Sequence, residues 1–148
     1  MSDLIELYQE VILDHTKSPR NFGNLEKATH IAEGHNPLCG DQVIVFLEMA
    51  DGGSKNIRFE GKGCAISTAS ASMMTEVLKG KRPEEIYSTF ELFHDLVTGK
   101  PAPKVDTLGK LAAFAGVAAF PVRVKCATLA WHTVKAALKK QHRPVTTE

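Results

Sequence analysis

Residues 42–64 of the 148-residue chain read QVIVFLEMADGGSKNIRFEGKGC. The first eight of these residues are rich in β-branched and aromatic side chains, a composition typical of a strand. The turn-forming sequence DGG follows at 51–53, and beyond it Ile57 and Phe59 alternate with polar neighbours. The stretch therefore predicts a β-hairpin whose second strand leads into GKGC at 61–64.

Further elements are predicted on both sides of this hairpin. Residues 28–34 can extend as an earlier strand. A first helix has Ser2 as its N-cap and ends near Lys17, because Ser18 precedes a proline. The later chain carries helical patterns over residues 66–79, 83–98, 107–119 and from 121 onward. Strands that come early and helices that come late indicate the α+β class.

The composition is that of one ordinary globular domain, with 43% hydrophobic and 24% charged residues in 16.1 kDa. A formal net charge of +1 argues against nucleic acid as the main partner. No apolar stretch reaches the ~18 residues that a membrane span needs. Because the N-terminal sequence also lacks a signal-peptide pattern, we expect a cytoplasmic protein without a membrane partner. Residues 1–141 are expected to form the domain and 142–148 a flexible tail.

Charge is distributed unevenly along the chain. Residues 1–75 hold six Lys and Arg against ten Asp and Glu, whereas residues 76–148 hold twelve against seven. Two interpretations stay open: solvated helix faces, or a basic docking surface for an acidic partner protein.

The three cysteines are the residues most suited to chemistry, and their odd number does not fit a disulfide framework. Cys39 lies in a predicted loop, Cys64 lies where a helix begins, and Cys126 lies in the first turns of the last helix. A thiol at a helix start is favoured as thiolate by the helix dipole and by unpaired N–H groups.

Three thiolates and one further ligand complete a tetrahedral zinc site, and Asp41 is the nearest candidate for that ligand. However, 24 residues separate Cys39 from Cys64 and 61 separate Cys64 from Cys126, which does not match the cysteine knuckles of zinc fingers. From spacing alone, a metal site and three unrelated thiols are equally open.

Other catalytic groups carry weaker signals. The serines that follow Cys64 form no nucleophile elbow, and the two glycines that flank Lys62 lack the other residues of a nucleotide-binding loop. We expect the following histidines, none of which adjoins a cysteine, to be surface or capping residues: His15, His30, His35, His94 and His132.

Six stretches of the chain resemble one family, the U-type iron–sulfur cluster assembly proteins with the IscU/NifU N-terminal fold. They are LYQEVILDH at 7–15, PRNFG at 19–23, NPLCGD at 36–41, GKGCAIS at 61–67, ASMM at 71–74 and RVKCATLAW at 123–131. Two features point to the SufU branch of that family. Lys125 stands where scaffold-type members carry a histidine, and residues 81–120 fit the insertion of SufU-type members.

The resemblance implies a compact α+β domain in which about five to six helices pack on a three-stranded antiparallel sheet. It also implies a zinc ion held by Cys39, Asp41, Cys64 and Cys126, with iron or a transient 2Fe–2S cluster as the alternative. The implied partners are a pyridoxal-phosphate cysteine desulfurase of the SufS type and downstream iron–sulfur scaffold or acceptor proteins.

The implied role is that of a sulfurtransferase-like persulfide acceptor without small-molecule turnover of its own. We expect Cys39 to accept the sulfur, because its Gly- and Pro-containing loop moves more easily than the helix starts that carry the other two cysteines. Lys125 either favours the thiolate or is simply solvated. Two alternatives are kept: a scaffold that assembles a 2Fe–2S cluster, and a structural zinc domain that binds proteins.

Overall fold

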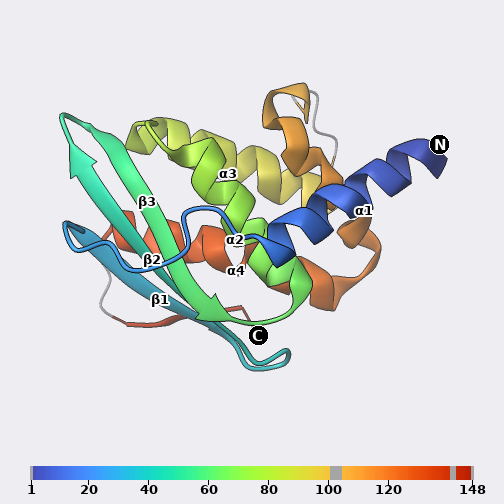
Figure 1. Ribbon diagram of the computed structural model, residues 1–148, viewed down its shortest axis with the longest axis horizontal. Helices are drawn as coiled ribbons and strands as arrows, with labels where there is room; N and C mark the ends of the chain where they lie inside the picture. The colour runs from blue at the N-terminus through green and yellow to red at the C-terminus, as the bar shows by residue number, and fades with distance from the viewer. Residues whose placement is uncertain (1, 101–104, 141–142, 148) are drawn as a thin grey trace.

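The computed structural model describes residues 2–100, 105–140 and 143–147 of the chain (Figure 1). The elements are α1 (Ser2–Lys17), β1 (His30–Asn36), β2 (Asp41–Ala50), β3 (Gly53–Lys62), α2 (Ala65–Leu78), α3 (Pro83–Val97), the 3₁₀ segment η1 (Val105–Ala119), α4 (Pro121–Leu138) and β4 (Val145–Thr146). The α+β class is confirmed, with five helical segments among the described residues.

The predicted hairpin is confirmed as β2 and β3, which pair antiparallel. Its turn consists of Asp51 and Gly52, both with positive φ angles of 54° and 82°. Such a two-residue turn matches the right-handed twist of the strands beside it. β1 pairs antiparallel with the other side of β2, in a register that places Asn36 opposite Asp41.

The prediction of a three-stranded antiparallel sheet is wrong. The described sheet has four strands in the order β3-β2-β1-β4, and β4 runs parallel to β1 with Gly34 opposite Val145. Without β4, the edge of β1 that faces away from β2 would have unpaired backbone groups. Two β-branched residues from the predicted tail pair with this edge. The boundary at residue 141 stays a prediction, and residues 141, 142 and 148 lie outside the described part.

Helices α2 and α4 pack on the sheet, and α1, α3 and η1 lie outside them (Figure 1). The core lies in this interface. Trp131 of α4 is fully buried and stacks on Phe93 of α3 with ring centroids 4.5 Å apart. The core thereby fixes α2 and α4 against the sheet, and the N-terminal ends of both helices carry cysteines.

The helix limits follow local rules where proline sets them. Helix α1 ends at Lys17, and α3 and α4 begin at Pro83 and Pro121 as predicted. The segment predicted as a helix at 107–119 is instead 3₁₀ in type, with a break at Gly109, whose φ is 57°. Among the described residues, no helix is long and apolar enough to cross a membrane.

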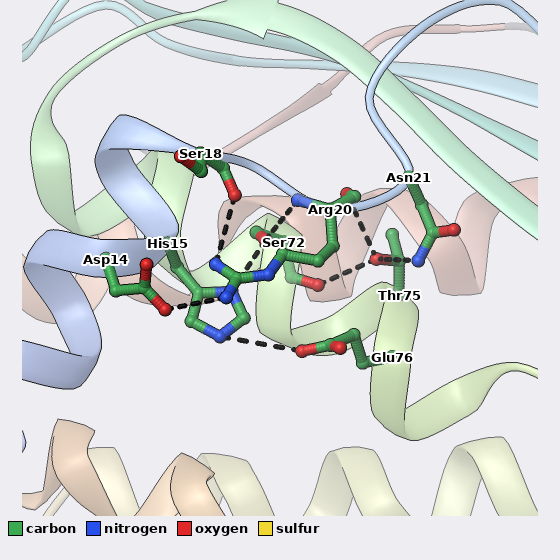
Figure 2. Close-up of polar contacts among 8 residues, drawn as sticks. All are labelled: Asp14, His15, Ser18, Arg20, Asn21, Ser72, Thr75 and Glu76. Carbon is green, nitrogen blue, oxygen red and sulfur yellow. Dashed lines mark hydrogen bonds and ion pairs between the residues drawn. The ribbon is translucent and has the colours of Figure 1, made fainter.

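A polar cluster fastens α1 to α2 (Figure 2). His15 Nδ1 lies 2.7 Å from Ser72 Oγ, and the same hydroxyl accepts the Arg20 backbone N–H at 2.8 Å. His15 Nε2 lies 3.5 Å from Glu76. His15 is 1% exposed, so the expectation of a surface or capping histidine is wrong at this position. The cluster positions α2, whose first turn begins at Cys64.

Candidate metal centre

Cys39 lies in the turn between β1 and β2. The Cys39 backbone N–H donates to the Asn36 carbonyl at 3.2 Å, and Gly40 supplies a positive φ of 69° that returns the chain into β2. The thiol is half-buried. The loop predicted from the sequence is therefore a tight turn whose backbone holds the sulfur at the end of the sheet.

Asp41 and Cys64 meet at the same end of the sheet. The carboxylate of Asp41 is 1% exposed and accepts the Cys64 backbone N–H at 2.8 Å, and its second oxygen lies 3.8 Å from the Cys64 sulfur. Cys64 is the N-cap of α2, and its sulfur accepts the Ser67 N–H at 3.4 Å. A Cβ at Gly63 would overlap the Asp41 carboxylate, so only glycine allows this approach.

Cys126 comes from the second turn of α4 and is 2% exposed. Its sulfur lies 3.1 Å from that of Cys39. The donor atoms of Cys39, Asp41 and Cys126 all lie within 4.8 Å of one another. The Cys64 sulfur contacts the Asp41 carboxylate of this group. The fold thus brings together Cys39, Asp41 and Cys126, and it places Cys64 beside Asp41 but outside this group of donor atoms. The full set of four ligands stays a prediction.

The chemistry of this donor set fits a soft divalent cation. Thiolate sulfurs and a carboxylate oxygen are donors that Zn²⁺ binds in tetrahedral sites. Burial, followed by hydrogen bonding to Cys39, Asp41 and Cys64, raises the pKa of the Cys126 thiol above its ordinary value. The Cys126 thiol therefore keeps its proton unless a cation replaces it.

Lys125 precedes Cys126 and is half-buried. Its backbone carbonyl accepts hydrogen bonds from the hydroxyl of Thr147 at 3.3 Å and from that of Thr128 at 3.4 Å. The C-terminal segment after β4 therefore reaches the start of α4. A role of the Lys125 ammonium in tuning the site stays a prediction.

Asn36 is the residue of this centre that the sequence did not single out. Its side chain is fully buried, and Nδ2 donates to the Cys126 sulfur at 3.6 Å. Its Oδ1 has no hydrogen-bond partner among the described residues. Its signals in the sequence were its place in the stretch NPLCGD at 36–41 and its position directly before Pro37, which also suits an ordinary turn.

Exposed apolar side chains border the centre. Leu38 is 63% exposed beside Cys39, and Val122 is 51% exposed one helical turn before Cys126. An apolar groove lies between α1 and η1. Its lining includes Ile66, two residues after Cys64, and Arg123. Exposed apolar surface around a polar site is typical of a protein-docking face.

Among protein families, the profile of the NifU-like N terminal domain matches residues 7–127 of this chain. The chain belongs to this family. The match spans every residue of the centre from Asn36 to Cys126.

Two curated relatives of this NifU-like domain cover almost the whole chain. The first is the "Iron-sulfur cluster assembly scaffold protein IscU" of Streptococcus pyogenes serotype M1, with 40% identity over 95% of this chain and 87% of the relative. The second is the "Zinc-dependent sulfurtransferase SufU" of Bacillus subtilis (strain 168), also with 40% identity, over 95% of both chains.

A solved structure agrees with these relatives. The candidate iron–sulfur cluster assembly scaffold protein for the SUF system from Fervidobacterium islandicum AW-1 has a TM-score of 0.83 and 35% identity. The match covers 93% of this chain and 99% of that one. Together with the SufU relative, this places the chain among the SufU-type members of the NifU-like family.

Proposed function

We propose that this NifU-like domain acts in iron–sulfur cluster assembly as a zinc-dependent sulfur acceptor for a cysteine desulfurase. The observation that carries the proposal is the meeting of Cys39 and Cys126, 3.1 Å apart, beside the buried Asp41. The name of the Bacillus subtilis relative, a zinc-dependent sulfurtransferase, supports the same function.

The proposed zinc ligands are Cys39, Asp41, Cys64 and Cys126. Bound zinc would keep the cysteines as thiolates at neutral pH. The chain's own residues orient these donors: Asp41 is fixed by the Cys64 N–H, and Cys64 by the N–H of Ser67. Because Asp41 is the single oxygen donor among three sulfurs, it is the ligand best suited to adjust when one thiolate leaves.

Cys39 is the proposed acceptor, because it lies on a half-buried turn whereas Cys126 is 2% exposed within a helix. The Cys39 thiolate attacks the terminal sulfur of the desulfurase persulfide. A new S–S bond forms at Cys39 while the S–S bond of the donor breaks, and the donor cysteine leaves as thiolate. No oxidant is needed, because one disulfide-type bond replaces another.

The exposed Leu38 and Val122 support docking of a protein at this face. Lys125 and Arg123 belong to the basic half of the chain and place positive charge at the start of α4. We therefore propose that the partner contacts the site with an apolar patch and neighbouring acidic groups.

The test combines the zinc-loaded protein with a SufS-type cysteine desulfurase, L-cysteine and a reductant. We expect faster alanine production and a gain of sulfur mass on the Cys39 peptide. Cys39→Ser should abolish the sulfur gain. Leu38→Ala, with an intact ligand set, should bind zinc normally and weaken the stimulation. No stimulation and no sulfur on Cys39 in the unmodified protein would reject the proposal.

A second candidate function is a scaffold for a 2Fe–2S cluster, favoured by three thiols in one site and by the name of the Streptococcus pyogenes relative. Anaerobic reconstitution with iron and sulfide separates the two functions. A stable visible chromophore that passes to an apo-ferredoxin would favour the scaffold over the sulfur acceptor.

A further inference from the structure

Asn36 is linked to two of the three sulfurs through different parts of its structure. Its backbone carbonyl accepts the Cys39 N–H at 3.2 Å and thereby closes the turn that carries Cys39. Its side-chain Nδ2 points at the Cys126 sulfur at 3.6 Å. The residue is fully buried at the end of β1, opposite Asp41, so both contacts are shielded from water.

The orientation of the Asn36 amide presents a hydrogen-bond donor to the Cys126 sulfur. Nδ2 can only donate and a cysteine sulfur can accept, so this contact constrains the position of the sulfur. The structure directs Nδ2 to the sulfur and leaves Oδ1 without a partner among the described residues. A buried unpaired oxygen costs free energy. The amide is thus arranged to orient the Cys126 sulfur at the expense of its own oxygen.

We propose that Asn36 is a positioning residue that holds Cys126 as the non-exchanging thiolate of the metal centre. The N–H···S hydrogen bond withdraws electron density from the Cys126 sulfur, which lowers its reactivity and fixes its direction. Cys39 receives a contact from Asn36 only at its backbone N–H, and its sulfur contacts the Cys126 sulfur but no Asn36 atom. Asn36 therefore makes the two neighbouring thiolates unequal. The inference rests on the metal site of the proposed function, but not on sulfur transfer.

The first test measures zinc binding by competition with a chromophoric chelator. Loss of a hydrogen-bond partner of a ligand typically weakens metal binding by about 10- to 100-fold, and we expect this for Asn36→Ala and Asn36→Asp. Ser54→Ala is the matched control. Ser54 is a fully buried polar residue at the opposite end of β3 from Cys64, bonded to the Leu78 and Lys81 carbonyls. The control should destabilise the fold and leave the zinc affinity within twofold.

The second measurement follows alkylation of the zinc-loaded protein by iodoacetamide with peptide mapping. In the unmodified protein we expect Cys39 to react well before Cys126, and in Asn36→Ala the share of label on Cys126 should rise several-fold. A folded Asn36→Ala with unchanged zinc affinity and unchanged label distribution would overturn the inference.

A third measurement needs no variant and covers the case that Asn36 variants do not fold. In protein loaded with cadmium-113, the Asn36 side-chain amide proton should couple to the metal through the Cys126 sulfur in an NMR spectrum. Absence of this coupling would overturn the inference. If the coupling and the affinity change are found but no sulfur reaches Cys39, the proposed function fails and the role of Asn36 stands.

Discussion

Gly63 determines how closely Asp41 can approach Cys64. Gly63→Ala would place a methyl group on the Asp41 carboxylate without a backbone conflict, because the φ of Gly63 is not positive. We expect the carboxylate to move and zinc affinity to fall by at least about tenfold, as measured by chelator competition. Gly116→Ala, whose Cβ meets no described atom within 4 Å, is the control and should bind zinc normally. Equal affinity of both variants would contradict this account.

Asp41 combines a proposed ligand role with a hydrogen bond to the Cys64 N–H. Asp41→Ala removes both, and we expect zinc to dissociate at least about tenfold faster, followed by transfer to a chromophoric chelator. Asp41→Asn keeps one oxygen for the Cys64 N–H. Its rate of zinc dissociation should therefore lie between those of Asp41→Ala and the unmodified protein. Identical dissociation from Asp41→Ala and from the unmodified protein would exclude Asp41 as a ligand.

At the scale of elements, the cluster between α1 and α2 makes stability depend on pH. Burial, reinforced by Arg20 and opposed by Glu76 and Asp14, lowers the pKa of His15 below its ordinary value of 6.5. The unfolded chain therefore binds a proton more readily than the folded one. The contribution of His15 to the free energy of unfolding is fully present above pH 6.5. It declines as the pH falls toward the pKa of His15 in the folded protein.

Urea unfolding between pH 7.5 and 5 measures this effect. The contribution of His15 has a slope of at most about 1.4 kcal/mol per pH unit. His15→Gln should flatten the pH dependence in part, because burial also lowers the pKa values of His30 and His132. The same slope in His15→Gln and in the unmodified protein would show that His15 does not couple folding to pH.

The elements that could be predicted are those fixed by local rules. The turn at Asp51 and Gly52, and the helix starts at Pro83 and Pro121, depend on backbone preferences of the residues concerned. β4 could not be predicted, because two residues form a strand only where the edge of β1 is available. The burial of His15 likewise depends on where α2 packs.

The candidate centre shows the same limit. The spacing of the cysteines left a metal site and unrelated thiols equally open, since nothing in 87 residues of sequence separation indicates that Cys39 and Cys126 meet. The register that sets Asn36 opposite Asp41, together with the packing of α4 on β1, brings them together. The ligand set came from resemblance to a family, and the contact of Asn36 with Cys126 emerged only from the folded structure.

At the scale of the whole molecule, the centre joins the β1–β2 turn, β2, α2 and α4, while a separate apolar core holds the sheet and helices together. A chain of this size buries enough surface to fold without a metal, unlike a zinc finger. Chelation should therefore leave the far-ultraviolet circular dichroism nearly unchanged.

Zinc present at 1,000 times its Kd adds about 4 kcal/mol of stability, so chelation should lower the Tm by roughly 10 °C in calorimetry. The Ser54→Ala variant should show the same decrease relative to its own zinc-loaded form. Complete loss of the dichroism on chelation would instead favour the structural zinc domain, whose folding depends on the metal.

The parallel pairing of β4 with β1 has a consequence for biosynthesis. Gly34 meets Val145, and Cys39 meets Cys126 from a helix that is made late. As a nascent chain leaves the ribosome, the β2–β3 hairpin can form early, whereas the edge of β1 can pair with β4 only after residues 145–146 have been made. With the proposed ligands, metal loading would therefore be a late event of synthesis, and a chain arrested before α4 would present Cys39, Asp41 and Cys64 without Cys126.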